Sequence, residues 1–356
     1  MPEPRAPVPQ TPFDPHGGPD GHTGEALLDF SVNSNPFGPP PELLATLSEV
    51  EVSTYPDPAA RLARAALAEH HALEFERIVM GNGAAELIHR VAAVYLTPGS
   101  RVVVAAPSFG EYARASTLYG AEVTEVEVYA GSPAATTLAE AVERYSPTLV
   151  WLCHPNNPTG HAWTQEGLAV VAAACEQVDA LLCIDAAYLR LSELDVVAPV
   201  LPANALHLHS LTKSFCVPGL RVGYAVAPQR VAEALRRIAA PWQASAHAQR
   251  AAHWAVSAAG ERFLARTVPE LLALSGRFRE RIRALGVEVG ESYTPYFLVE
   301  VGSAQGFKAA AGAAGFRVRD ASSFGLPRHI RVATRRPADN EQLLAWWAET
   351  GVRERG

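Results

Sequence analysis

The segment SLTKSFCVPGLRVGY, residues 210–224, contains the most informative lysine of the chain. Lys213 follows a strand-like apolar run and is surrounded by hydroxyl side chains, and Arg221 lies eight positions later. A lysine amine can form a Schiff base with a carbonyl compound when burial or a nearby positive charge lowers its pKa. Arg221 could supply that charge while binding a phosphate through its planar fork. Taken alone, a lysine after a strand is a solvated surface cation in most proteins.

Lysine is rare in the rest of the chain. The 356 residues include 30 basic and 37 acidic ones, which gives a net charge of −7, and only Lys213 and Lys308 are lysines. A general preference for arginine explains much of this scarcity, and Lys308, in QGFKAAAGAAG, is expected on a solvated outer helix. The mildly acidic total without a basic run argues against nucleic acid or an anionic membrane as the principal partner.

Length and hydrophobic content predict a globular, cytoplasmic protein of about two domains. Hydrophobic residues make up 48% of the chain, which is enough for large buried cores. No apolar stretch reaches the roughly 18 residues that span a bilayer, and the start MPEPRAPVPQ lacks the apolar core of a signal peptide. The four cysteines lie far apart, so we expect reduced core thiols and neither a disulfide framework nor a metal site.

The order of sequence patterns predicts an α/β fold. Helical patterns around 60–71, 84–95, 109–119, 164–177 and 229–238 are interleaved with the apolar runs RVVVAA, PTLVWLC, ALLCID, ALHLHS and RVGYAVA. Such alternation favours a mostly parallel sheet that is covered by helices on both faces. Ligands of such sheets bind where loops leave the carboxyl ends of the strands.

The predicted organisation has four parts. Residues 1–26 are expected to form an N-terminal tail, and residues 27–50, which include LLDFSVNSNPFGPPPELL, an arm that joins the small domain. Residues 51–240 would form a large ligand-binding domain, and residues 241–356 a connecting helix and a smaller C-terminal α/β domain. In that last part a long helical stretch from Pro241 precedes expected strands at 286–290, 296–301, 315–319 and 329–334, with helices at 304–314 and 338–350.

Three other segments place polar groups near expected strand ends. GNGAAELIHRV, residues 81–91, has glycines that let a ligand approach the backbone before a helix start, where an anion is favoured, although a plain turn is the alternative. CHPNNPTGH, residues 153–161, offers two asparagine side chains as neutral donors, or it is an ordinary Asn-Pro turn. LLCIDAAYL, residues 181–189, ends an apolar strand on Asp185, which is costly unless the carboxylate is paired or caps a helix.

Taken together, the ordered motifs GNGAAE, PNNPTG, D-x-x-Y and S-x-T-K with Arg221 resemble the class I/II aminotransferase family of pyridoxal-phosphate enzymes. The resemblance covers almost the whole chain. It implies the fold of the fold type I enzymes, a mostly parallel sheet with helices on both faces and a smaller C-terminal α/β domain. It also implies that pyridoxal 5'-phosphate is the cofactor.

The resemblance implies a role for each matching residue. Lys213 would hold the cofactor as an internal aldimine and later move the proton, while Asp185 would pair with the pyridine nitrogen. Asn157 and Tyr188 would bind the ring hydroxyl oxygen. The ring face would stack on Phe109, in APSFGEY, and the phosphate would be held by Ser210, Thr212, Arg221 and the amides of Ala84 and Ala85.

The same resemblance implies a homodimer with shared active sites, because Tyr55, in TYPDP, matches the tyrosine that reaches the phosphate of the neighbouring subunit's cofactor. Arg331, in IRVATRR, matches the arginine that clamps a substrate carboxylate, for which a bidentate fork is well suited. Arg319, in RVRD, resembles an arginine that binds a substrate phosphate, with an exposed arginine of no function as the alternative. His16 could bind that phosphate or belong to a tail without function. The remaining expected substrate contacts are Gly38 and Asn157.

The implied substrate is a small phosphorylated amino acid or amino alcohol. HGG at His16, LLDFSVNSNPFGPP and RVRDASSF most resemble the enzymes that decarboxylate L-threonine O-3-phosphate to aminopropanol phosphate in cobalamin synthesis. Amino transfer from histidinol phosphate to 2-oxoglutarate is the close alternative, because the same residues support both reactions. Ser245 and Tyr296 stand at positions that are usually asparagine-rich in the family. A DNA-binding regulator on this fold is disfavoured, since no basic helix-turn-helix pattern precedes it.

Overall fold

A seven-stranded sheet lies at the centre of the computed structural model, which describes residues 27–129, 134–194 and 203–350 together with residues 8, 11, 17 and 18. β8 runs antiparallel to both of its neighbours, and all other neighbouring strands are parallel. The mostly parallel sheet that the sequence predicts is therefore confirmed. The strands in spatial order are β2 (Ile78–Gly81), β8 (Gly223–Val226), β7 (Ala205–Ser210), β6 (Leu181–Asp185), β5 (Leu149–Cys153), β3 (Arg101–Ala106) and β4 (Glu122–Glu127).

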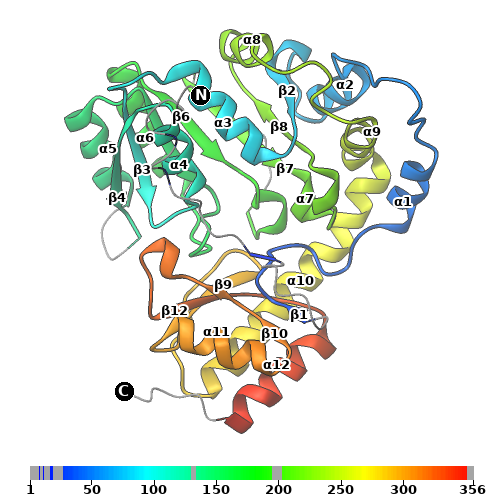
Figure 1. Cartoon of the computed structure of the whole chain (residues 1–356), viewed down its shortest axis with the longest axis vertical. Coiled ribbons are helices and arrows are strands. Elements are labelled where there is room, and N and C mark those ends of the chain that lie inside the picture. Colours follow the sequence, from blue (N-terminus) through cyan, green and yellow to red (C-terminus); the bar gives the residue numbers. More distant parts are fainter. Residues whose placement is uncertain are drawn as a thin grey trace, which may run out of the picture.

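Helices cover both faces of this sheet (Figure 1). Successive strand residues point to opposite faces, so Val79 packs on one side while Ile78 and Met80 pack on the other. The first face is covered by α3 (Ala84–Tyr95), α4 (Glu111–Leu118) and α8 (Gln229–Arg237). The second face is covered by α5 (Ala134–Tyr145), α6 (Gln165–Gln177), α2 (Arg61–His70) and α9 (Ala246–Ala255). Also on the second face, beside α9, is α1 (Pro41–Ser48).

Short helical turns lie beside several of the strands. α7 begins directly after β7, and η3 follows β6 after three intervening residues, so both lie near the predicted site residues. The turns are η2 (Phe75–Arg77), η3 (Leu189–Leu191), α7 (Leu211–Ser214) and η4 (Pro218–Leu220).

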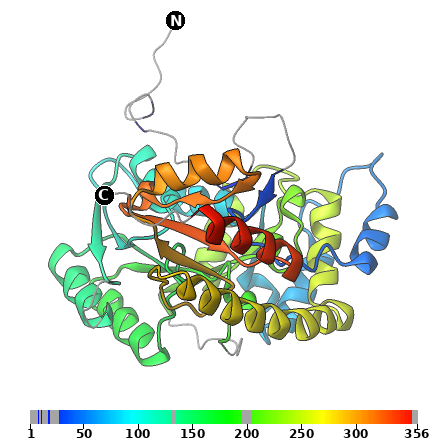
Figure 2. The ribbon, with the colours of Figure 1, turned by 90° about the horizontal axis from the view of Figure 1, so that it is seen from below.

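The C-terminal part of the chain builds a second, smaller sheet. The long helix α10 (Ala258–Ala284) runs from the region of the large sheet down to it (Figure 1). β11 (Arg319–Asp320), β12 (His329–Ala333) and β9 (Tyr296–Glu300) form this antiparallel sheet in that order. In the view from below, α12 (Pro337–Thr350) lies between α10 and α11 (Ala304–Ala313) (Figure 2). The remaining elements are η5 (Ser322–Phe324) and β1 (Leu28–Asp29), which pairs in parallel with β10 (Phe316–Arg317).

The pairing of β1 with β10 ties residues near the start of the described chain to the C-terminal part. Phe30, directly after β1, is fully buried in the core cluster that also contains Phe278 and Phe297. The boundaries predicted at residues 26, 50 and 240 stay a prediction.

Three expected elements of the C-terminal part are wrong in detail. Residues 286–290 do not form a strand, because Gly286 has a φ of 84° after α10 and only Val289 bridges to Val299. The helical stretch from Pro241 is interrupted, since α9 ends at Ala255 and α10 begins afresh at Ala258. The expected strand at 315–319 is divided into β10 and β11.

The described residues can also be searched for membrane-spanning helices, metal-binding groups and disulfides. Among them, no helix is long and apolar enough to cross a membrane, and no three His, Cys, Asp or Glu side chains are grouped so that they could hold a metal ion. All four cysteines are free, and Cys153, Cys175 and Cys183 are buried.

Gly223 brings β8 against the start of α3. A Cβ atom at this position would lie 2.7 Å from the amide nitrogen of Ala84 and 2.8 Å from the carbonyl oxygen of His209. Both are backbone atoms, which cannot rotate away as a flexible side chain could. The end of the sheet can therefore meet the N-terminus of α3 only with glycine at this position.

We expect Gly223→Ala to lower the free energy of unfolding by about 1–3 kcal/mol, because the added methyl group overpacks a contact between backbone segments. The control is Gly312→Ala in α11, where a Cβ atom meets nothing within 4 Å. This control should stabilise the protein slightly, by up to about 1 kcal/mol, as alanine does in a helix. Urea unfolding measures both, and equal effects of the two substitutions would contradict the role of Gly223.

Candidate active site

A cavity of about 260 Å³ lies between the carboxyl ends of β5, β6 and β7 and the strand pair β11–β12. This is the edge of a parallel sheet at which ligands are expected. The structure brings most of the predicted site residues to the wall of this cavity: Ala84, Ala85, Phe109, Asn157, Asp185, Tyr188, Ser210, Thr212, Lys213, Arg221, Arg319 and Arg331.

Lys213 lies in the single helical turn α7 that follows β7. Burial first, and then the positive charges of Arg331 and Arg221, lower the pKa of its amine to about 8, whereas Asp185 opposes the shift. The shift has the two causes that a Schiff-base lysine requires, removal from water and neighbouring positive charge. Part of the amine is therefore unprotonated close to neutral pH, and this part grows as the pH rises through about 8.

Asp185 ends β6 with a buried carboxyl group. Its Oδ1 accepts a hydrogen bond from the amide of Ala187 at 2.9 Å, and its Oδ2 accepts one from the hydroxyl of Tyr112 at 2.7 Å. Burial raises the pKa of Asp185, while these two hydrogen bonds and the charge of Lys213 act in the opposite direction. A cationic ligand group beside Asp185 would relieve the cost of burying this carboxylate.

Tyr112 is a site residue that the sequence reasoning missed. Its ring lies parallel to that of Trp151, with centroids 5.3 Å apart, and edge-on to that of Phe109, with centroids 5.6 Å apart. These contacts fix the hydroxyl that holds Asp185. The only signal was its place in the segment APSFGEY, three residues after Phe109.

The first turn of α3 forms an anion-binding corner of the cavity. Its N-cap, Gly83, offers no side-chain hydrogen bond, so the amides of Ala84 and Ala85 remain available for a ligand. The hydroxyls of Ser210 and Thr212, which lie 2.7 Å apart, and the guanidinium of Arg221 line the same cavity. Amides, hydroxyls and a guanidinium together suit a phosphate group.

Gly83 keeps this corner open. A Cβ atom on Gly83 would lie 2.5 Å from Nη2 of Arg221, and the residue has a φ of 83°, which disfavours other amino acids. Arg221 itself has a φ of 50° after η4. The two unusual backbone conformations bring the guanidinium against the start of α3.

Asn157 and Tyr188 line the side of the cavity that faces the small sheet. The side-chain oxygen of Asn157 accepts a short hydrogen bond from Nη1 of Arg331. Tyr188 is buried, and burial raises the pKa of its hydroxyl to about 12, so it remains a hydrogen-bond donor at neutral pH. Phe109, two residues before the start of α4, also lines the cavity.

Arg319 and Arg331 face each other across β11 and β12 as partners in the antiparallel register. Both are buried, with 8% and 5% of their surface exposed, and both line the cavity. Arg331 donates through Nη2 to the carbonyl oxygen of Ser31 at 2.6 Å, and Arg319 donates through Nη2 to the hydroxyl of Ser323 at 2.7 Å. The interpretation of Arg319 as an exposed arginine is therefore wrong.

Of the remaining predicted residues, Tyr55 and Gly38 do not line the cavity. Tyr55 is 78% exposed and stacks on Trp242 with ring centroids 4.5 Å apart, so its contact with a neighbouring subunit's cofactor stays a prediction. Gly38 packs on the backbone of Phe215, behind the lysine turn, so a direct substrate contact is not seen. His16 lies outside the described residues.

Other cavity residues were missed although they lie in segments that the sequence analysis had singled out. Ser31 and Asn33 are buried and belong to the run LLDFSVNSNPFGPP. The amide of Gly18 donates to the hydroxyl of Ser31 at 2.9 Å, and Gly17 lines the cavity. The others are Val32, Cys153, Ala187 and Phe324.

Comparison with known proteins identifies relatives over nearly the whole chain. The family model for aminotransferase class I and II matches residues 25–345. The chain is 31% identical over 331 residues to the histidinol-phosphate aminotransferase of Symbiobacterium thermophilum, with 89% of each protein covered. The structure of histidinol-phosphate aminotransferase from Sinorhizobium meliloti in complex with pyridoxal 5'-phosphate has a TM-score of 0.88 at 23% identity, covering 98% of this chain and 97% of that one.

A structure of a different activity is also similar. L-threonine-O-3-phosphate decarboxylase from Porphyromonas gingivalis has a TM-score of 0.79 at 26% identity, with 91% of this chain and 98% of that chain covered. The two structures thus share one fold and differ in the reaction that their names state.

We expect Tyr112→Phe to weaken the support of Asp185 while the ring contacts with Trp151 and Phe109 remain. Loss of a donor to a carboxylate should lower the free energy of unfolding of the cofactor-free protein by about 1.5–3 kcal/mol. The Tyr112 bond lowers the pKa of Asp185. The loss is therefore largest above that pKa, where Asp185 is ionised, and shrinks as the pH falls through it.

Urea unfolding at mildly alkaline and mildly acidic pH measures this difference. Tyr145→Phe on α5, away from the cavity, is the matched control and should change stability little at either pH. A loss for Tyr112→Phe that is independent of pH would show that the hydroxyl does not act on Asp185.

Proposed function

Because this chain belongs to the class I and II aminotransferase family, we propose that it is a pyridoxal 5'-phosphate enzyme that decarboxylates L-threonine O-3-phosphate to aminopropanol phosphate. Its fold is that of the fold type I enzymes, with a mostly parallel sheet and a smaller C-terminal α/β part. The fold alone does not select a reaction, so the proposal is carried by the residues of the cavity.

The observation that carries the proposal is the pair of buried arginines that line the same cavity as Lys213. Arg319 and Arg331 enter one cavity from neighbouring strands. Two guanidinium groups in one cavity favour a ligand with two anionic groups. Each guanidinium can bind a carboxylate or a phosphate through its planar fork. L-threonine O-3-phosphate carries both anions in one small molecule.

The residues present fit the cofactor. The open corner at Gly83, with the amides of α3, the two hydroxyls and Arg221, suits its phosphate. Asp185 is a buried carboxylate that a protonated ring nitrogen would neutralise. Lys213 has the lowered pKa that a covalent bond to a carbonyl carbon needs.

When bound, pyridoxal 5'-phosphate supplies a conjugated ring that accepts the electron pair from a bond broken at the substrate's α-carbon. Asp185 keeps the proton on the ring nitrogen, and Tyr188 donates to the ring oxygen. Arg331 holds the substrate carboxylate, and Arg319 holds the substrate phosphate. Lys213, whose pKa of about 8 leaves part of the amine protonated near neutral pH, would give a proton to the α-carbon after the carboxylate has left.

Amino transfer from histidinol phosphate is the second candidate, because the curated relatives are named for that reaction. It uses the same residues, with the α-hydrogen leaving in place of the carboxylate and Lys213 moving that proton. The choice depends on which bond at the α-carbon Arg331 and Arg319 hold in the reactive direction. The motifs HGG, LLDFSVNSNPFGPP and RVRDASSF favour decarboxylation.

The functional unit of the proposal is a homodimer. Tyr55 and Trp242 form an exposed aromatic pair, with 78% and 44% of their surfaces accessible in the single chain. Exposed paired rings are typical of surfaces that a partner covers. In the dimer Tyr55 would reach the cofactor phosphate of the other subunit.

We expect the protein with added pyridoxal 5'-phosphate to develop a near-visible absorbance band, and borohydride to fix the cofactor on the peptide that contains Lys213. The rate of attachment should rise as the pH increases through about 8, because the amine must lose its proton. Lys308→Ala is the control and should be labelled like the unchanged protein. A Lys213→Ala protein with the same covalent adduct would contradict the assignment.

The reaction itself is tested with two separate incubations. With L-threonine O-3-phosphate alone, the proposal expects carbon dioxide and aminopropanol phosphate without any need for a 2-oxo acid. With histidinol phosphate and 2-oxoglutarate, formation of glutamate would select the second candidate. If neither mixture reacts while the Lys213 adduct forms, the substrate assignment of Arg319 and Arg331 is wrong.

A further inference from the structure

Tyr296, the first residue of β9, contacts several cavity residues without being assigned a part in the chemistry. The side chain is fully buried. In the small sheet it pairs with Ala333, two residues beyond Arg331 on β12. Its side chain reaches across to the large-sheet part of the molecule, where its hydroxyl donates to the carbonyl oxygen of Asn156 at 3.0 Å.

The ring of Tyr296 touches two residues to which ligand contacts are proposed. Its centroid lies 4.8 Å from that of Tyr188, with the rings inclined at 65°. The guanidinium carbon of Arg331 lies 5.7 Å from the same centroid, within the range of a cation–π contact. One side chain thus supports Arg331, flanks Tyr188 and holds the residue that precedes Asn157.

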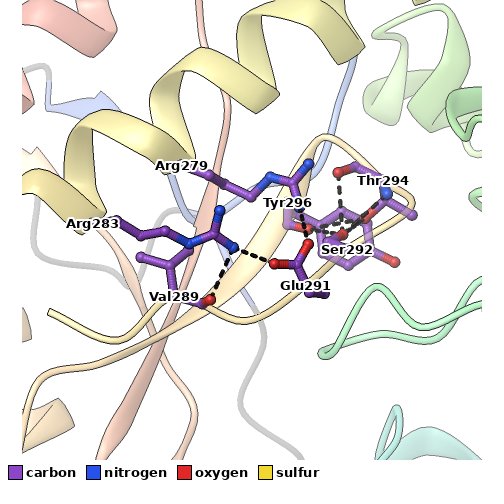
Figure 3. A network of polar contacts seen from close by, with 7 residues as sticks. All are labelled: Arg279, Arg283, Val289, Glu291, Ser292, Thr294 and Tyr296. Carbon is purple, nitrogen blue, oxygen red and sulfur yellow. Dashed lines mark hydrogen bonds and ion pairs between the residues drawn. The ribbon is translucent and has the colours of Figure 1, made fainter.

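The backbone of Tyr296 is itself held firmly (Figure 3). Its carbonyl oxygen accepts hydrogen bonds from the hydroxyls of Ser292, at 2.6 Å, and Thr294, at 3.0 Å. Figure 3 also shows Glu291 between Arg279 and Arg283 of α10, to which it is paired at 3.3 Å and 2.6 Å. The segment before Tyr296 is therefore fastened to the long helix.

This same segment lies directly on the Pro/Gly turn that carries Asn157. A Cβ atom on Gly160 would lie 1.9 Å from the hydroxyl oxygen of Ser292. The amide of Tyr293 donates to the carbonyl oxygen of Gly160 at 3.0 Å. The hydroxyl of Tyr296 adds a further link from the small sheet to this turn.

The hydroxyl is not needed to satisfy the backbone group that it contacts. The carbonyl oxygen of Asn156 also accepts the amide of Gly160 at 2.7 Å, so it would stay hydrogen-bonded without Tyr296. A phenylalanine could fill the same space in the ring cluster. What phenylalanine could not do is link the turn of Asn157 to the strand beside Arg331.

We propose that Tyr296 is a positioning residue that couples the Arg331 carboxylate site to the Asn157–Tyr188 side of the cavity. This inference rests on the proposed function for the role of Arg331. Through the hydroxyl bond to Asn156 and the ring contact with Arg331, Tyr296 keeps the guanidinium and the asparagine at one fixed spacing. An anion that binds Arg331 therefore meets a site that is already ordered.

The experiment compares Tyr296→Phe with Tyr293→Phe in the cofactor-loaded protein. Both substitutions remove one hydroxyl from the same segment, but Tyr293 is 44% exposed. The probe is 3-phosphonopropionate, which has a carboxylate and a phosphonate but no amino group and so cannot react. Isothermal calorimetry should show roughly two- to tenfold weaker binding for Tyr296→Phe, the effect of one hydrogen bond, and unchanged binding for Tyr293→Phe.

A double-mutant cycle with Arg331→Lys tests whether Tyr296 affects probe binding through Arg331. In the Arg331→Lys protein, Tyr296→Phe should weaken probe binding by less than twofold, because the group that it positions has been replaced. Equal losses in both backgrounds would overturn the coupling. Unchanged probe affinity in Tyr296→Phe, even with a lower melting temperature, would show that the residue is structural only.

The failure of this inference differs from a failure of the proposed function. If no covalent adduct forms at Lys213, the cofactor assignment fails. If the adduct forms but L-threonine O-3-phosphate releases no carbon dioxide, the proposed reaction fails, while the probe, which does not react, still measures the coupling. If adduct and reaction are both present and the probe binds all variants equally, only the role of Tyr296 is wrong.

Discussion

The burial of unlike charges around one cavity is the interaction on which the rest of this site depends. Lys213 and Arg331 bring positive charge to the cavity, and the buried Asp185 brings negative charge. Burial opposes the charged form of each group, since it lowers the pKa of Lys213 and raises that of Asp185. The hydrogen bonds from Tyr112 and Ala187 to Asp185 favour its ionised form, in which it can pair with a cationic group. A ligand with both a cationic ring and anionic groups satisfies this arrangement.

The backbone delivers these charges through simple geometry. Parallel strands end at the same edge, so Asp185 at the end of β6 and Lys213 just after β7 are neighbours without any direct sequence relation. The small sheet delivers its charges differently, because antiparallel pairing puts Arg319 and Arg331 directly opposite each other. The cavity is therefore lined by residues from two sheets, one whose strands are parallel at this site and one whose strands are antiparallel.

Most of the fold and the cavity could be predicted because its motifs are local. A glycine-rich helix start, an Asn-Pro turn and a lysine after a strand each place their own polar groups with little help from the rest of the chain. What the sequence could not show was contact between distant segments. Tyr112 and Tyr296 look like ordinary core aromatics, and only the fold brings their hydroxyls to Asp185 and Asn156.

The same distinction explains the errors in secondary structure. β4, with the sequence EVTEVE, was not foreseen because its charged residues suit an edge strand, where solvent takes up one side. Residues 286–290 have the apolar content of a strand, but the turn at Gly286 leaves Val289 as the only residue that pairs.

The position of Tyr296 bears on why two reactions remain close on this scaffold. Decarboxylation and amino transfer share the lysine, the carboxylate and the phosphate corner, so none of these residues selects between them. Selection rests on the angle at which the substrate's α-carbon is presented, and in the proposed function Arg331 would set that angle from the small sheet by binding the carboxylate. A residue that fixes Arg331 against the turn of Asn157 therefore acts on the one variable that separates the reactions. Tyr296 occupies that place, with its ring beneath the guanidinium and its hydroxyl on the turn.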